Sequence, residues 1–358
     1  INSMTVNSKI YGYGYDANSV VEAVSLPNAT THTYTSNNMN RITNIAIAGI
    51  SNTLDSYAYT LGAVGNRTGV TEHSGRVIAW AYDGLYRLTG EVITNGNVNG
   101  NVGYMYDSVS NRETRSSDIP AIPAQAYTGM FDGNDRLTAS GFTWDNNGNQ
   151  LTDDIGRTYT YNAENRLVRV QGAGLDVEYA YNDEGLRVSR ADNIADVTTD
   201  YLWDENSITG YPQVLEEIEG GNAIRRYAYG PTGIISQSVY DGTSWDTHYY
   251  NKDATGTMRS LTDENGAVVF ERDFDAWGNV LSTLNLDPGT LSCYFGLHGE
   301  YADPATNLVY LRARWYAPEA GRFLAMDRFE GVHEEPISLH KYLSFNADPV
   351  NKQDPSGY

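Results

Sequence analysis

The sequence predicts an all-β protein built from antiparallel hairpins, and three observations support that prediction. A short phrase recurs from residue 11 to residue 278: an aromatic residue, Asp or Asn, a turn of small polar residues, then Arg-Leu-Thr or a similar run. Tyrosines spaced two apart precede several copies. The composition is rich in Tyr (28, against 8 Phe) and in Gly (35), which suits strands and tight turns. Such a repeat is typical of a protein that grows hairpin by hairpin.

The first strand of each repeat ends on the aromatic residue. Side chains alternate along a strand, so two tyrosines separated by one residue point to the same face of the sheet. Tyrosine carries an apolar ring and a hydroxyl, and it suits a sheet with one wet face. The pairs are Tyr57 and Tyr59, Tyr104 and Tyr106, Tyr159 and Tyr161, Tyr179 and Tyr181, and Tyr227 and Tyr229.

The turn of each repeat opens on Asp or Asn, whose side chain can accept hydrogen bonds from backbone amides two residues on. Three residues later the chain must adopt a left-handed conformation. Residue types that tolerate it stand there: Asn40, Asp135, Gly148, Asn165 and Gly185. Tyr86 occupies the same position against this rule, and the sequence offers no reason for it.

The number of repeats limits the shape that they can build. Some 13 units give about 26 strands, and at about 4.8 Å per strand the sheet is about 125 Å long. A sheet of this length exposes edges unless it coils. We therefore predict antiparallel hairpins coiled into a ring or short hollow barrel about 40 Å across.

Charge and composition exclude several classes of function. A net charge of −21 argues against binding to nucleic acid or anionic membranes, and no apolar run is long enough to cross a membrane. Cys293 is the only cysteine and has no triad partners, so we expect it to be buried rather than nucleophilic. The six histidines lack metal-ligand spacing, and we predict no metal and no cofactor.

Three stretches resemble RHS proteins. Residues 144–167 (WDNNGNQLTDDIGRTYTYNAENRL) closely match the YD repeats of that family. Residues 249–280 and 310–324, which include YYNKDATG, FDAWGNV, YLRARWY and GRFL, resemble the RHS repeat-associated core. The resemblance covers almost the whole chain. It is most specific in the C-terminal third.

The resemblance implies a continuous spiralling β-sheet that forms a hollow cocoon, with a C-terminal segment turned inward as a plug. It divides the chain into a YD-repeat shell, residues 1–240, and a core, residues 241–358, with a plug strand over residues 308–316. RHS proteins enclose a variable C-terminal polypeptide, often a toxin. The implied partners are that cargo and a secretion or upstream shell component, and the implied location is secreted or at the cell surface. The chain begins at Ile1 without an initiator Met, as expected of a processed segment.

Many RHS proteins also free their cargo with a built-in aspartyl protease formed by two Asp-Pro-x-Gly motifs. The second motif is intact in residues 354–357, which makes Asp354 one candidate. The first matches Asp327, but no proline follows it and the glycine is one residue late. Asp354 comes 27 positions after Asp327, some five more than usual in the family. Arg314 occupies the position that the family pairs with the two aspartates, and cleavage is expected near Gly357 and Tyr358.

These residue types suit peptide hydrolysis. Two carboxyl groups brought close together share a proton, so one can activate water while the other polarises the scissile carbonyl. A guanidinium can lower one pKa or bind the oxyanion. The alternative is that both aspartates only initiate turns that shape the plug.

The function predicted from the family is a shell that encapsulates a toxin or effector and releases it in a single-turnover reaction. The rival is an extracellular adhesion or glycan-binding scaffold that resembles the teneurin YD shell and has no catalytic activity. No motif supports an enzyme that acts on a diffusible substrate.

Overall fold

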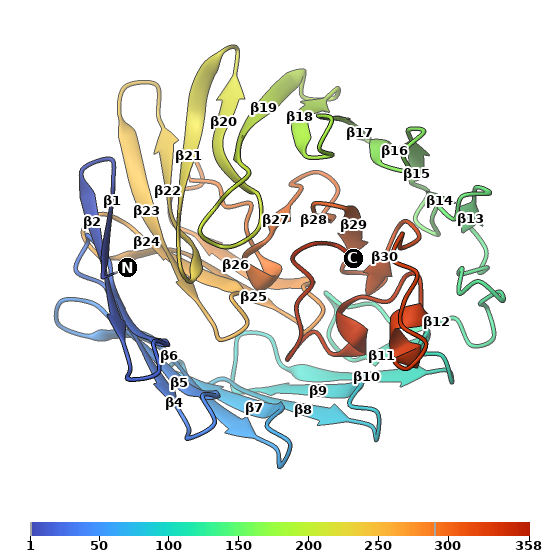
Figure 1. Cartoon of the computed structure of the whole chain (residues 1–358), viewed down its shortest axis with the longest axis horizontal. Coiled ribbons are helices and arrows are strands. Elements are labelled where there is room, and N and C mark those ends of the chain that lie inside the picture. Colours follow the sequence, from blue (N-terminus) through green and yellow to red (C-terminus); the bar gives the residue numbers. More distant parts are fainter. Residues whose placement is uncertain (1, 290) are drawn as a thin grey trace.

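The computed structural model describes residues 2–289 and 291–358, and it shows a coiled wall of β-hairpins around a C-terminal segment (Figure 1). The wall consists of two sheets of 12 and 14 strands, close to the number expected from the repeat, and each strand pairs with its neighbours in the sequence. All pairs within the wall are antiparallel. The first sheet contains β1 (Ser3–Val6), β2 (Lys9–Tyr15), β3 (Val21–Ser25), β4 (Thr31–Ser36), β5 (Ile42–Ala48), β6 (Thr53–Leu61), β7 (Arg67–Glu72), β8 (Val77–Tyr82), β9 (Leu88–Thr94), β10 (Gly100–Tyr106), β11 (Arg112–Ser117) and β12 (Gln125–Ala126).

The second sheet continues the wall. It contains β13 (Thr143–Trp144), β14 (Gln150–Thr152), β15 (Thr158–Tyr161), β16 (Leu167–Gly172), β17 (Leu175–Tyr181), β18 (Arg187–Asp192), β19 (Val197–Asp204), β20 (Gln213–Glu219), β21 (Asn222–Gly230), β22 (Gly233–Tyr240), β23 (Trp245–Lys252), β24 (Met258–Thr262), β25 (Val268–Phe274) and β26 (Val280–Asn285). The two sheets are separated by residues 127–142, where Gly129, Asp135 and Gly141 all take positive φ. Successive turns leave too few residues there for a strand.

The coil brings the first sheet against the last strands of the second. Tyr11 on β2 shares a 2.7 Å hydrogen bond with Ser236 on β22, and His32 on β4 shares one of 2.9 Å with Asn251 on β23. On β24, Arg259 forms a 3.0 Å ion pair with Glu72 on β7. These contacts join residues far apart in the sequence. They connect the first sheet to the last strands of the second sheet, so that the wall forms a ring. The predicted all-β coiled shell is confirmed.

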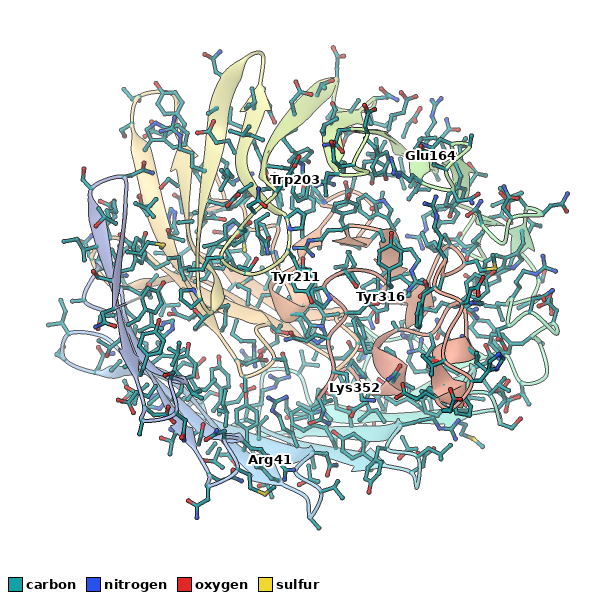
Figure 2. All side chains as sticks on the ribbon, viewed as in Figure 1. Arg41, Glu164, Trp203, Tyr211, Tyr316 and Lys352 are labelled. Atoms are coloured by element: carbon teal, nitrogen blue, oxygen red, sulfur yellow. The ribbon has the colours of Figure 1, made fainter. Side chains whose placement is uncertain are left out.

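The C-terminal segment, residues 291–358, lies inside the ring (Figure 1). It contains a four-stranded sheet and three short 3₁₀ turns: β27 (Tyr301–Ala302), β28 (Val309–Leu311), β29 (Arg314–Ala317), β30 (Arg322–Phe323), η1 (Leu297–Gly299), η2 (Pro336–Leu339) and η3 (Phe345–Ala347). Figure 2 shows Tyr316 of β29 in the interior and Arg41 at the outer rim. The single strand predicted over residues 308–316 is wrong: β28 and β29 form a hairpin, since Arg312 reverses the chain with φ of +63°.

The two tyrosines of a pair share one face of the sheet, as their spacing predicts, and that face packs against the inner segment. Tyr57 and Tyr104 are buried, whereas Met105, which points to the other face, is 65% exposed. The rings pack with apolar residues of the inner segment, such as Val309 and Tyr316. The core therefore lies between the wall and the plug, and burial of tyrosine rings contributes to holding the plug in the ring.

The turns also follow the prediction. In the turn that Asp83 opens, its Oδ1 accepts hydrogen bonds from the amides of Leu85 (2.9 Å) and Arg87 (3.0 Å). Positive φ occurs at each of the positions expected from the sequence: Asn40, Asp135, Gly148, Asn165 and Gly185. Tyr86 also adopts it, with φ of +62°.

Replacing Tyr86 with glycine is expected to stabilise the protein. A non-glycine residue in the left-handed region is destabilised by about 1–2 kcal/mol, partly offset by the greater freedom of glycine in the unfolded chain, so the net gain is about 0.5–1 kcal/mol. The Tyr86 side chain is 49% exposed, so little packing is lost. Urea unfolding would measure the gain.

The reciprocal change provides the control. Gly156 has φ of +82° and open space where a Cβ would stand. Gly156→Ala should therefore destabilise the protein by about 1 kcal/mol through backbone strain alone. If both substitutions shift the unfolding midpoint in the same direction, backbone strain does not explain the effect at Tyr86.

Candidate functional site

The candidate site is built around Arg314, the first residue of β29. Pairing of β29 with β28 and β30 places this side chain inside the ring, where it is 5% exposed. Its guanidinium lies 3.7 Å from the centre of the Phe323 ring. This stacking fixes the plane of the guanidinium and leaves its edges free for polar partners.

Arg314 contacts both predicted aspartates. Its Nη2 lies 2.6 Å from Oδ2 of Asp327 and 3.9 Å from Oδ2 of Asp354. The two carboxylates are 11% and 13% exposed. The structure thus brings together three residues that the sequence places up to 40 positions apart.

Each aspartate uses its two oxygens differently. Oδ1 of Asp327 accepts a 2.7 Å hydrogen bond from the amide of Phe329. Oδ1 of Asp354 accepts bonds from the amides of Gly357 (2.8 Å) and Tyr358 (3.2 Å). Both residues therefore initiate turns, and both also turn Oδ2 toward Arg314.

The altered first motif does not displace Asp327. Its backbone amide donates a 2.9 Å hydrogen bond to the carbonyl of Lys341, which also accepts a 3.0 Å bond from Nη1 of Arg314. This contact closes the base of a loop over residues 328–340, which contains exposed Phe329.

Burial shifts the pKa values of two groups in the site. It raises the pKa of Asp354, and the nearby Arg314 guanidinium opposes that shift. Burial also lowers the pKa of Arg314, which the carboxylates of Asp327 and Asp354 oppose. A carboxyl group with a raised pKa is suited to donate a proton, and an ion-paired carboxylate is suited to accept one.

Of the two predicted cleavage-proximal residues, Gly357 lies against the same arginine. The carbonyl of Gly357 accepts a 2.5 Å hydrogen bond from Nε of Arg314. Gly357 has φ of +78°, and a Cβ there would lie 2.2 Å from the carbonyl oxygen of Leu311. Only glycine fits this position. Tyr358 is 58% exposed.

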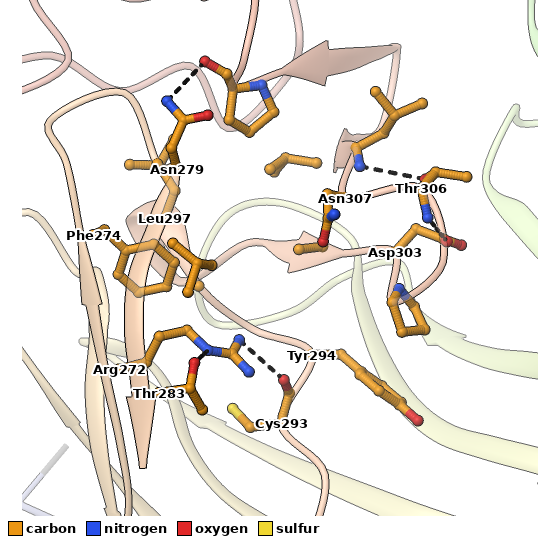
Figure 3. Close-up of a pocket in the computed structure, with 18 of the residues that line it drawn as sticks. Arg272, Phe274, Asn279, Thr283, Cys293, Tyr294, Leu297, Asp303, Thr306 and Asn307 are labelled. Atoms are coloured by element: carbon orange, nitrogen blue, oxygen red, sulfur yellow. Dashed lines mark hydrogen bonds between the residues drawn. The ribbon is translucent and has the colours of Figure 1, made fainter. Parts of the chain in front are cut away.

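Other candidate features lie elsewhere. Cys293 is 4% exposed, burial raises the pKa of its thiol, and it lines a cavity of about 720 Å³ between β25, β26 and the plug (Figure 3). None of the predicted site residues lines that cavity. In residues 2–289 and 291–358, no His, Cys, Asp and Glu side chains gather in a group that could hold a metal ion. Over the same residues, no helix has the length and apolar character needed to cross a membrane.

Sequence reasoning missed several parts of the site. Phe323 belongs to the GRFL segment of residues 321–324, but nothing in the sequence indicates that its ring lies under Arg314. The carbonyl of Lys341 carries no sequence signal, because any residue supplies one. Arg312 and Glu300, whose side chains form a 2.9 Å ion pair beside residue 355, were not singled out.

Comparisons with known proteins agree with this architecture. The sequence model of the teneurin YD-shell family matches residues 86–350. The chain is 29% identical to the tRNA nuclease WapA of Bacillus subtilis strain 168 over 77% of this chain and 12% of that protein. It is 26% identical to Teneurin-3 of Mus musculus over 88% of this chain and 11% of that protein.

A solved Tc holotoxin pore of Photorhabdus luminescens has the same fold, with a TM-score of 0.80 and 17% identity over 97% of this chain and 19% of the other. The chain therefore spans a small part of the length of each of these proteins. The repeat, the coiled wall and the family match lead to one conclusion: the chain belongs to the teneurin YD-shell family and is an RHS/YD-repeat shell protein.

Proposed function

We propose that this chain is the part of an RHS shell that encloses a C-terminal toxin or effector and releases it by self-cleavage near Tyr358. The observation that carries the proposal is the contact of one buried arginine, Arg314, with both Asp327 and Asp354 inside the ring. The relatives include a protein named as a tRNA nuclease and a structure named as a toxin pore, which is compatible with a toxic cargo.

The reaction assigned to this site is hydrolysis of one peptide bond. Asp327, ion-paired with Arg314, accepts a proton from water, and the water oxygen attacks the scissile carbonyl carbon. Asp354, whose pKa is raised by burial, donates its proton to the departing amide nitrogen. The C–N bond breaks, leaving a new carboxyl group on the shell and a free amine on the cargo. Because the substrate is part of the same chain, each molecule reacts once.

Substitution of either aspartate should abolish cleavage. A form of the protein extended beyond Tyr358 by its natural downstream sequence is expected to separate into two bands on a denaturing gel. Asp327→Asn and Asp354→Asn each remove a proton-transfer group, so both should leave the chain intact, a loss of about 100-fold or more in rate.

The matched control is Asp348→Asn. Asp348 is also a buried aspartate of the plug, but it bonds Asn351 rather than Arg314. This variant should still cleave. If the wild-type chain and both aspartate variants give the same uncut band, the protease assignment is wrong.

Enclosure of the cargo is a separate proposal. The ring interior at this end is filled by the plug, so cargo would lie on the side toward the rest of the shell. An enclosed cargo should resist added protease until the shell is denatured. We also propose that residues 1–240 and 241–358 act as shell and core, that the shell meets a secretion or upstream component, and that the whole is exported.

The rival function is adhesion or glycan binding. It is favoured by the likeness to Teneurin-3 and by a partly exposed aromatic pair, Tyr240 and Trp245, with ring centres 5.3 Å apart. Most repeat tyrosines are buried against the plug and cannot stack on a sugar. Saturable binding on a glycan array that Tyr240→Ala removes would favour the rival.

A further inference from the structure

We infer that Arg312 is a positioning residue that holds the Asp354 turn in place for the reaction. Its catalytic meaning rests on the self-cleavage proposed above. The inference comes from contacts around the β28–β29 turn, where Arg312 and Ala313 connect the two strands.

Arg312 occupies a backbone position that favours glycine. Its φ is +63°, in the left-handed region, and its side chain is 9% exposed. A long charged side chain in such a conformation is uncommon, and backbone strain of this kind persists only where the surrounding structure enforces it. The contacts of the guanidinium supply a reason for an arginine at this point.

The guanidinium ties three parts of the molecule together. Nη1 donates hydrogen bonds to the Pro355 carbonyl at 2.6 Å and to Oε2 of Glu300 at 2.9 Å. Nε donates to the carbonyl of Pro212 at 2.9 Å. Pro212 belongs to the β19–β20 connection, which also places Tyr211 inside the ring (Figure 2). Arg312 thereby anchors the Asp354 turn both to the plug and to the wall.

The β28–β29 turn binds residues 355–357 through three consecutive backbone carbonyls. The carbonyl of Pro355 accepts a hydrogen bond from the side chain of Arg312. The next carbonyl, of Ser356, accepts one from the amide of Ala313 (3.2 Å), and that of Gly357 accepts one from the side chain of Arg314 (2.5 Å). Arg312 holds the first of these carbonyls, next to Asp354. Loss of that bond frees the residue that links Asp354 to the rest of the segment.

The position of Asp354 depends on that segment. Its Oδ1 caps the amides of Gly357 and Tyr358, and its Oδ2 faces Arg314 at 3.9 Å. If residues 355–357 move, the cap and the contact with Arg314 are lost together. Displacement of a reacting group by about 1 Å can slow a reaction about 100-fold.

Arg312→Gly is the sharpest variant, because glycine adopts the left-handed conformation without strain while the whole side chain, with all its guanidinium contacts, is removed. Arg312→Lys is the conservative variant, since it retains the charge and one donor group. Arg190→Gln is the matched control: Arg190 is a buried arginine of the wall that pairs with Asp303 of the plug at 2.7 Å and does not touch residues 354–358.

Two measurements test the inference at a temperature where all variants are folded. In the 358-residue chain itself, hydrogen exchange of the Gly357 amide should be about tenfold faster or more in Arg312→Gly, intermediate in Arg312→Lys and unchanged in Arg190→Gln. In the extended chain, Arg312→Gly should slow cleavage about 10- to 100-fold, with partial recovery in Arg312→Lys.

The outcomes separate this inference from the proposed function. If the Gly357 amide of Arg312→Gly exchanges at the wild-type rate, the inference is wrong. It is also wrong if Arg190→Gln speeds that exchange as much as Arg312→Gly does, because the plug as a whole would then be loosened. Failure of the wild-type chain to cleave, together with faster exchange only in the Arg312 variants, would reject the protease and leave the positioning of the Asp354 turn established.

Discussion

Arg187→Ala is expected to lower the free energy of unfolding by about 3–5 kcal/mol, the range found when a large buried side chain is removed. Arg187 on β18 has no exposed surface, and its guanidinium carbon lies 4.2 Å from the centre of the Tyr201 ring and 4.3 Å from that of Tyr301. Three more rings surround it within 6 Å, those of Tyr179, Tyr310 and Trp315.

The aromatic rings are the main partners of this charge. Among the described residues, none accepts a hydrogen bond from Nε, Nη1 or Nη2 of Arg187. A desolvated cation over an aromatic face gains about 2 kcal/mol or more, against about 0.5–1 kcal/mol for an exposed one. Tyr201 belongs to the wall and Tyr301 to the plug, so the substitution removes a link between them as well as leaving a cavity.

A second arginine provides a control at the same distance. Arg226 lies 4.2 Å from the centre of the Trp245 ring, but its side chain is 39% exposed. Arg226→Ala should lower stability by less than about 1 kcal/mol. Urea unfolding followed by circular dichroism would measure both. Equal losses of stability in the two variants would show that the burial of Arg187 among aromatic rings does not explain the effect of Arg187→Ala.

Local features of the fold could be predicted from the sequence because they depend on near neighbours. The two-residue spacing of Tyr57 and Tyr59 determines which face they share, and Asp83 finds its amide partners within four residues. Tyr86 shows where this reasoning is incomplete. The turn of the repeat requires positive φ at this position, although tyrosine does not favour it. The conformation of the turn therefore prevails over the intrinsic preference of the residue.

Contacts between distant residues could not be predicted in the same way. The seam that joins β2–β9 to β22–β26, and the contact of Arg187 with the Tyr301 ring, bring together residues 100 or more positions apart, without a motif that names both partners. The aspartates and Arg314 were found only through resemblance to a family. The positions of Phe323 and Lys341 required the structure, since a ring face and a backbone carbonyl leave no pattern in the sequence.

The seam also contains a buried acid that should make stability depend on pH. Glu91 on β9 is 1% exposed, and its Oε2 accepts a 2.9 Å hydrogen bond from the amide of Ala276 on the opposing turn. Burial and the nearby Asp275 raise the pKa of Glu91 from its ordinary value of 4.5 to about 7, and Arg76 opposes the shift. The folded protein therefore binds a proton that the unfolded chain releases between these values.

The sign follows from that difference. Because the pKa of Glu91 is raised in the folded state, its contribution to the free energy of unfolding is fully present below pH 4.5. That contribution is lost as pH rises through about 7. The total loss is about 3 kcal/mol. Glu91→Gln keeps an acceptor for Ala276 but cannot ionise, so it should be more stable than the wild type by about 3 kcal/mol at pH 8 and by about 1–2 kcal/mol at pH 5.5.

Urea unfolding at the two pH values tests this expectation, and Glu205→Gln is the control, because Glu205 is exposed between β19 and β20. Removing its charge should change stability by less than about 0.5 kcal/mol at either pH. A gain in Glu91→Gln that is the same at pH 5.5 and pH 8 would mean that Glu91 does not titrate in this range. A loss at pH 8 would mean that its charge stabilises the seam through Arg76, because an ion pair that outweighs the cost of burial would favour the ionised acid.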